Sequence, residues 1–135
     1  MTESLIETLL NAPYVAKFGV RLERKGDELT GVLPYDESLV GNPLVPALHG
    51  GAVGAFMEVV ASASLLAGQN LTRLPKPIDV AIDYLRPARP QDVYGRALIA
   101  RRGSRVANVR AEVWQDRRDA PVATLHGHFL ITPEG

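Results

Sequence analysis

The sequence predicts an α+β fold in which one curved antiparallel sheet wraps around a single long helix. A chain of 135 residues has the length of one domain, so residues 1–135 are expected to form a single unit. Residues 50–67 form the longest continuous apolar segment and predict the helix, whereas about six other segments alternate apolar and polar residues as half-buried strands do. Because one long helix has to cover about six strands, a sheet curled around it is the simplest packing.

The first third of the chain predicts a short amphipathic helix followed by a hairpin. Residues 4–12 place their leucines and isoleucine on one face, and Pro13 is expected to stop this helix. Residues 20–24 and 28–33 then read as two strands joined by a tight turn. Residues 34–48 hold three prolines and one glycine and predict a loop. This loop is long for a structureless connection, which hints at a function.

The apolar segment 50–67 is rich in Ala, Gly, Val and Ser and contains one charged residue, Glu58. Gly68 is expected to end the helix. The stretch from Ala47 to Ala67 is apolar enough to suggest a membrane span, but a carboxylate at mid-span costs about 2.5–3.5 kcal/mol. A buried core helix is therefore the preferred interpretation, and no membrane association is expected.

The second half of the chain predicts four strands joined mainly by short hairpins. The alternating segments are residues 78–85, 92–101, 106–115 and 122–131. His126 and His128 share one face of the last strand, which could suggest a metal site. A zinc site needs three or four ligands and the sequence shows no third partner, so no metal is expected.

Composition excludes several functional classes. Fifteen Lys and Arg balance fifteen Asp and Glu, which argues against a nucleic-acid-binding protein. The chain has no cysteine, so it has no disulfide and no thiol nucleophile. The N-terminal segment lacks the basic region of a signal peptide. A cytoplasmic location is the expectation, and without a dinucleotide-binding or phosphate-binding glycine motif no cofactor is expected.

His49, Gly50 and Gly51 fall at the predicted start of the long helix. The first backbone N–H groups of a helix have no intrahelical partner and lie at the positive end of the helix dipole. The two glycines allow another group to approach this backbone closely. Such a helix start can polarise a carbonyl or hold an oxyanion.

Glu58 is the second candidate for chemistry, because a carboxylate in an apolar helix must be paired, hydrated or functional. Desolvation would raise its pKa, which suits a general base, and Ser62 follows one turn later on the same face. His49 and Glu58 are nine residues apart, which is about 13 Å along a helix. One helix cannot bring both to the same reacting atom. If they act together, a second subunit must supply the helix start, which predicts a homodimer with two shared sites.

The run LHGGAVGAFMEVVASAS at residues 48–64 resembles the hotdog-fold thioesterases, in particular the PaaI-like branch of phenylacetyl-CoA and 4-hydroxybenzoyl-CoA thioesterases. Residues 77–88 resemble the third strand of that family, and Gly103 with Arg105 falls where members carry a Gly-Arg turn. The resemblance implies a hotdog fold, assembly into a homodimer or a homotetramer, and hydrolysis of an acyl-CoA thioester.

The resemblance also implies catalytic roles. Glu58 matches the family acid, acting as nucleophile or as general base on water, and Gly50 matches the residue whose N–H polarises the thioester carbonyl. His49 matches a histidine that positions the loop and the substrate, and Ser62 matches a hydroxyl that places water or the acid. Members often carry Asn or Gln six residues before the histidine. That position is proline here, and Asn42, one residue upstream, is assigned the polar role.

Binding of the substrate requires cations for the phosphates of CoA, which is part of the substrate rather than a cofactor. Arginines clustered at one predicted hairpin tip are the first candidates, with Arg86 and Arg89 as further ones. The expected substrate-binding residues are Gly51, Tyr84, Arg101, Arg102, Ser104 and Arg105.

Two alternatives remain open at this point. The first is a binding module of the same fold that holds an acyl-CoA or another acyl ligand without turnover, suggested by the prolines at 43 and 46. The second is a hotdog hydratase, which ranks last because the Asp-and-His segment of those enzymes is not evident.

Overall fold

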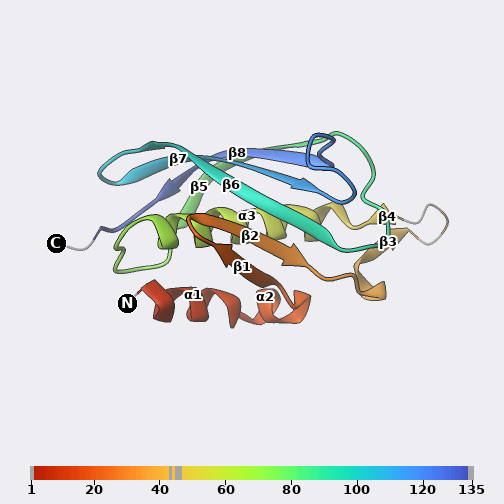
Figure 1. The fold of residues 1–135 in the computed structure, drawn as a ribbon, viewed down its shortest axis with the longest axis horizontal. Helices are drawn as coiled ribbons and strands as arrows, with labels where there is room; N and C mark the ends of the chain where they lie inside the picture. Colours follow the sequence, from red (N-terminus) through yellow and green to blue (C-terminus); the bar gives the residue numbers. More distant parts are fainter. Residues whose placement is uncertain (1, 43, 45–46, 134–135) are drawn as a thin grey trace.

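The computed structural model describes residues 2–42, 44 and 47–133 of the chain (Figure 1). Two short helices and a hairpin precede the long helix, and four long strands follow it. The elements are α1 (Thr2–Leu10), α2 (Pro13–Phe18), β1 (Arg21–Lys25), β2 (Glu28–Leu33), the 3₁₀ turn η1 (Glu37–Leu39), β3 (Val40–Asn42), β4 (Ala47–Leu48), α3 (Gly50–Gly68), β5 (Lys76–Tyr84), β6 (Val93–Arg102), β7 (Val106–Trp114) and β8 (Ala123–Leu130).

In the described part of the chain, the main sheet has six strands in the order β1-β2-β6-β7-β8-β5, and all neighbours are antiparallel. The sheet curves around α3, as Figure 1 shows, which confirms the predicted α+β architecture. The strand order places β5 at one edge although it directly follows α3 in the sequence. Among the residues that the structure describes, this edge position leaves one side of β5 without a neighbouring strand in the main sheet.

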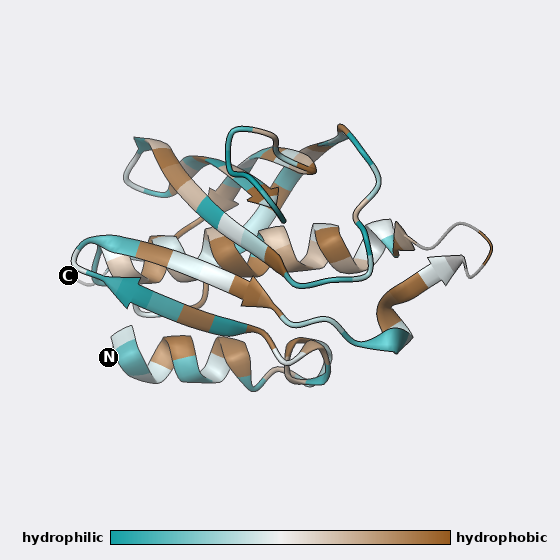
Figure 2. Ribbon diagram, turned by 45° about the vertical axis from the view of Figure 1, so that its right-hand side comes forward, coloured by the Kyte–Doolittle hydropathy of each residue, from teal (hydrophilic) through white to brown (hydrophobic). Residues whose placement is uncertain are grey.

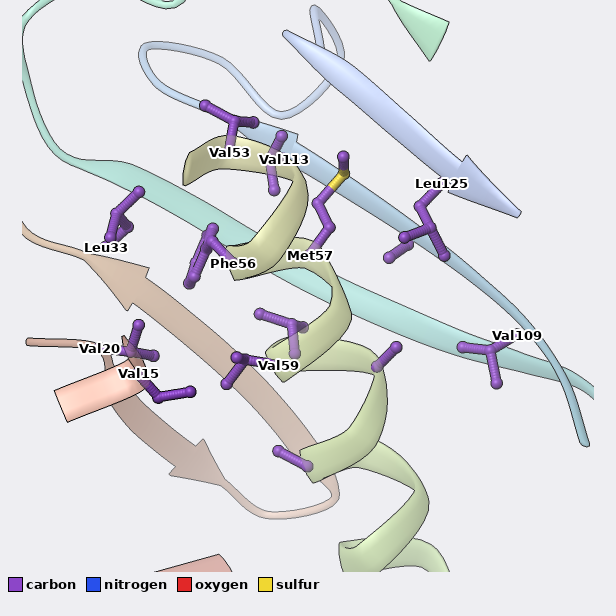
Figure 3. Close-up of a cluster of buried hydrophobic side chains, with 14 of the residues drawn as sticks. Val15, Val20, Leu33, Val53, Phe56, Met57, Val59, Val109, Val113 and Leu125 are labelled. Carbon is purple, nitrogen blue, oxygen red and sulfur yellow. The ribbon is translucent and has the colours of Figure 1, made fainter. Parts of the chain in front are cut away.

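The long helix α3 is the core of the fold. Most of its side chains are buried, and Figure 3 shows Phe56, Met57 and Val59 leaving it in different directions toward the sheet and α2. In Figure 2 the helix is pale or brown along nearly its whole length, whereas α1 alternates between hydrophobic and hydrophilic residues. The helix is long and apolar enough to cross a membrane, but 67% of that window is buried inside the protein. It is a core helix, as expected.

Two glycines of the sheet allow α3 to approach it closely. A Cβ atom on Gly31 would lie 2.6 Å from Cγ2 of Val60, and one on Gly95 would lie 3.1 Å from Cε2 of Phe56. These two glycines face each other across β2 and β6. Because neither carries a side chain, the large residues of the helix fill the space above the sheet.

Two predictions about local structure were wrong, and one short helix was not predicted. The first helix does end before Pro13, as expected, but Pro13 also begins α2, because proline fits the first position of a helix, where its missing N–H is not needed. The segment 34–48 is not structureless, since it contains η1 and the strand pair β3–β4. Gly68 does not lie beyond the long helix but is its last residue, and Nη1 of Arg102 donates to its carbonyl at 3.1 Å.

Candidate active site

The start of α3 is held by backbone hydrogen bonds from both sides. The N–H of Leu48 donates to the carbonyl of Ala88 at 2.8 Å, and that of His49 donates to the carbonyl of Leu39 at 2.6 Å. The carbonyl of His49 then accepts from the N–H groups of Ala52 and Val53. The segment before the helix is therefore fixed relative to both the 3₁₀ turn and the segment that follows β5.

This arrangement leaves two backbone donors at the helix start. His49 is the N-cap residue and makes no capping bond with its side chain. Within residues 2–42, 44 and 47–133, the N–H groups of Gly50 and Gly51 have no hydrogen-bond acceptor. Two adjacent N–H groups at the positive end of a helix can bind a carbonyl oxygen or an oxyanion.

The exposed side chain of His49 lies over the backbone of β3 and beside the helix start. A Cβ atom on Gly41 would lie 3.4 Å from Cδ2 of the His49 ring, and one on Gly51 would lie 3.6 Å from its Nδ1. The imidazole is therefore close enough to the two free donors to contact a group bound to them.

A small pocket adjoins this helix start. It has a volume of about 400 Å³, and its lining includes Leu48, Gly50, Val53, Tyr84, Leu85 and Arg86. Apolar side chains dominate the lining, while Arg86 supplies a cation. A pocket of this character suits an acyl chain or another apolar group next to a polarised carbonyl.

Glu58 lies two turns further along α3 and is half-buried. Burial raises the pKa of its carboxyl group above the usual value for glutamate. No hydrogen bond or ion pair reaches this carboxylate from any described residue. A desolvated carboxylate without a cation beside it is a stronger base than an exposed one, as the sequence predicted.

Ser62 is buried one turn beyond Glu58 on the same face of α3. Gly54, one turn before Glu58, also lies on this face, and a Cβ there would be 3.1 Å from Cδ1 of Ile82 on β5. The face that carries Glu58 therefore borders the edge strand of the sheet. Asn42 is the last residue of β3, and its side chain lies outside the described part of the structure, as do Pro43 and Pro46.

The predicted phosphate-binding residues lie at the other end of α3. Arg101, Arg102, Ser104 and Arg105 are exposed at the β6–β7 hairpin, whose turn is closed by the N–H of Gly103 on the carbonyl of Val106. Since Arg102 binds the carbonyl of Gly68, this hairpin is about 27 Å from Gly50 along the helix. Within one protomer, these arginines are not near the helix start.

Other polar features lie outside this region. On the outer face of the sheet, Nδ1 of His128 lies 2.8 Å from Oδ1 of Asp79, and this hydrogen bond lowers the pKa of Asp79. A larger hollow of about 1110 Å³ is lined by the β1–β2 hairpin, by β5–β8 and by the C-terminal end of α3, and there Arg96 pairs with Glu28 and Arg118 with Glu112. None of the predicted site residues lines it, so the smaller pocket is the better candidate.

The structure therefore brings together His49, Gly50, Gly51 and Tyr84, but places Glu58 about 12 Å beyond Gly50 along the helix axis. Tyr84 joins the group because its hydroxyl donates to the carbonyl oxygen of Gly50 at 2.8 Å. The alternation of β5 predicted the face on which Tyr84 lies but not this contact. Nothing in the sequence marked Val53 and Leu85 as pocket-lining residues, since both have the pattern of ordinary core residues.

Comparison with known proteins gives consistent matches. Residues 46–122 match the family model described as Thioesterase superfamily. The medium/long-chain acyl-CoA thioesterase YigI of Escherichia coli strain K12 is 27% identical over 121 residues, which cover 78% of this chain and 77% of that protein. A crystal structure from Chromobacterium violaceum is 37% identical with a TM-score of 0.75, covering 96% of this chain and 90% of that one. Another from Pseudomonas aeruginosa is 29% identical with a TM-score of 0.80, covering 96% and 98%.

Proposed function

Because the chain belongs to the thioesterase superfamily and is thus a thioester hydrolase, we propose that its substrates are acyl-CoA thioesters, which it cleaves to a free acid and CoA. The observation that carries this proposal is a pair of N–H groups, at Gly50 and Gly51, that have no acceptor among the described residues and lie beside an apolar pocket, on the same helix as a desolvated carboxylate. The name of the Escherichia coli relative supports medium or long acyl chains as the first to test.

In the proposed reaction, the thioester carbonyl oxygen accepts hydrogen bonds from the N–H groups at the start of α3. Charge that develops on this oxygen is stabilised by donors already in place. Glu58 either removes a proton from the attacking water or attacks the carbonyl carbon itself, in which case water then hydrolyses the anhydride. The C–S bond breaks, and CoA leaves as a thiolate that takes up a proton. His49 and Ser62 orient the substrate and the water.

If Gly50 and Glu58 act on the same thioester, they come from different subunits, because about 12 Å of helix separates them within one protomer. The exposed inner face of β5 supports a second copy of this chain as the partner. Ile78, Val80 and Tyr84 on this face are 55%, 37% and 54% exposed, although they continue the row that packs on α3 through Ile82. An apolar row on an unpaired edge strand is a typical site of association. Pairing of two β5 strands would cover it beside Glu58.

Thiol release from a panel of acyl-CoAs tests the proposed function. We expect the purified protein to hydrolyse at least one class among aromatic, short-chain and medium-to-long-chain thioesters. Tight binding without thiol release across the whole panel would instead favour the binding module suggested by the prolines near Asn42. Hydration of an enoyl-CoA without thiol release would favour a hydratase.

The raised pKa of Glu58 predicts the acid side of the pH–rate profile. Only the carboxylate form can accept a proton or attack, so kcat/KM should fall as the pH drops through this pKa. Because burial raises the pKa, the midpoint of this fall should lie above the usual glutamate value of about 4.3. The measurement is kcat/KM across the acid range in buffers of constant ionic strength. A midpoint at or below the usual value would show that the ionisation that limits the rate is not that of Glu58.

A charge on the inner face of β5 should separate the subunits. Ile78→Lys would place an ammonium in the proposed interface, one strand repeat further from Glu58 than Val80, at about 3–5 kcal/mol, so the dimer dissociation constant should rise at least hundredfold. Ala81→Lys is the matched control, because the same charge on the same strand lies on the outer face between Asp79 and Asp83. The fraction of dimer, measured by sedimentation equilibrium, and the rate of thiol release should both fall in Ile78→Lys and stay at wild-type values in Ala81→Lys. An intact dimer in Ile78→Lys would rule out this strand as the interface.

A further inference from the structure

Tyr84, the last residue of β5, reaches across to the first turn of α3. Its hydroxyl donates a hydrogen bond of 2.8 Å to the carbonyl oxygen of Gly50. A Cβ atom on Gly50 would lie 3.5 Å from Cε1 of the ring, and one on Gly54 would lie 3.2 Å from the phenolic oxygen. The two glycines, one turn apart, thus let the tyrosine lie directly against the helix backbone.

This bond acts on a peptide group that faces the site. The carbonyl of Gly50 and the N–H of Gly51 belong to one planar peptide unit and point in opposite directions. The carbonyl is held by Tyr84, while the N–H has no acceptor among the described residues. A hydrogen bond accepted by the carbonyl polarises the peptide and makes its N–H a stronger donor. The same bond limits rotation of the peptide unit at the helix start.

We propose that Tyr84 is a positioning residue for thioester hydrolysis, acting through the peptide between Gly50 and Gly51. It orients and polarises the Gly51 N–H, which joins the Gly50 N–H in binding the oxyanion. The inference rests on the proposed function. The sequence had suggested that Tyr84 contacts the substrate, whereas its hydroxyl is already engaged by the helix backbone.

Tyr84→Phe tests this role because it keeps the ring and removes only the hydroxyl. We expect kcat to fall about tenfold while KM for the acyl-CoA changes less than about twofold, since the lost effect belongs to the transition state. The Gly51 amide proton should also shift upfield in the NMR spectrum of the variant. Tyr94→Phe is the matched control, because Tyr94 packs against Trp114 on the outer face and should keep wild-type values.

The possible results separate this inference from the proposed function. The role is supported if the wild-type protein releases thiol and Tyr84→Phe has a reduced kcat, an unchanged KM and a shifted Gly51 amide resonance. If the wild-type protein releases thiol and the variant has the same kcat, the role of Tyr84 is overturned and the proposed function is left intact. A lower kcat together with a raised KM and a lower melting temperature also overturns it, since that pattern indicates structural damage. A wild-type protein that releases no thiol overturns both.

Discussion

Glu58→Gln is expected to lower kcat for acyl-CoA hydrolysis by about 10³-fold while leaving the fold intact. The amide has the shape of the carboxylate but can neither accept the proton of the attacking water nor attack the thioester. The same substitution should not lower the stability of the folded protein. Burial raises the pKa of Glu58, so the ionised side chain is less favourable in the folded protein than in the unfolded chain. A neutral glutamine removes this penalty, and the melting temperature should stay the same or rise.

Thiol release and a thermal scan of the same preparation provide the test. Glu23→Gln is a suitable control, because Glu23 is an exposed acid on β1 away from α3. Its hydrolysis rate should match that of the wild type. Full activity in Glu58→Gln would exclude the carboxylate from the reaction, and loss of activity accompanied by unfolding would indicate a structural role instead.

Gly50→Pro should lower kcat by about 10²–10³-fold, the usual effect of losing one oxyanion-binding donor. Proline lacks the N–H but suits the first position of a helix. The preceding residue must be extended, and His49 already has φ −60° and ψ 126°. A Cβ at position 50 would meet Tyr84 no closer than 3.5 Å, which is an ordinary contact. The variant should therefore fold and dimerise normally, which circular dichroism and sedimentation can check.

Mixing this variant with Glu58→Gln tests whether the site is shared between subunits. If Gly50 of one protomer works with Glu58 of the other, each mixed dimer contains one complete site and one that lacks both groups. Random exchange of subunits should then restore about one quarter of the wild-type rate, because half of the dimers are mixed and half of their sites are complete. A mixture that stays inactive after verified exchange would place both groups of a site in one protomer.

The main features of the fold could be predicted from local patterns. The alternation in residues 106–115 and 122–131 predicted β7 and β8 to within about a residue, because half-buried strands repeat with a period of two. The apolar segment predicted α3 as a core helix. The errors fell on segments that long-range contacts decide. Residues 34–48 contain regular structure partly because His49 donates to the carbonyl of Leu39, and Arg102, from a distant hairpin, caps the end of α3 at Gly68.

The candidate site also combines features that the sequence predicts with features that only the structure shows. The sequence by itself indicated His49, Gly50 and Glu58 as candidates, because unpaired N–H groups at a helix start and a carboxylate in an apolar helix follow from local composition. Their separation also followed, since the rise of a helix is constant. Only the tertiary structure decided that the face with Glu58 borders an edge strand and that Tyr84 holds the peptide after Gly50. The physical reason is that strand order depends on the packing of the whole sheet, whereas periodicity records only which side of each element is buried.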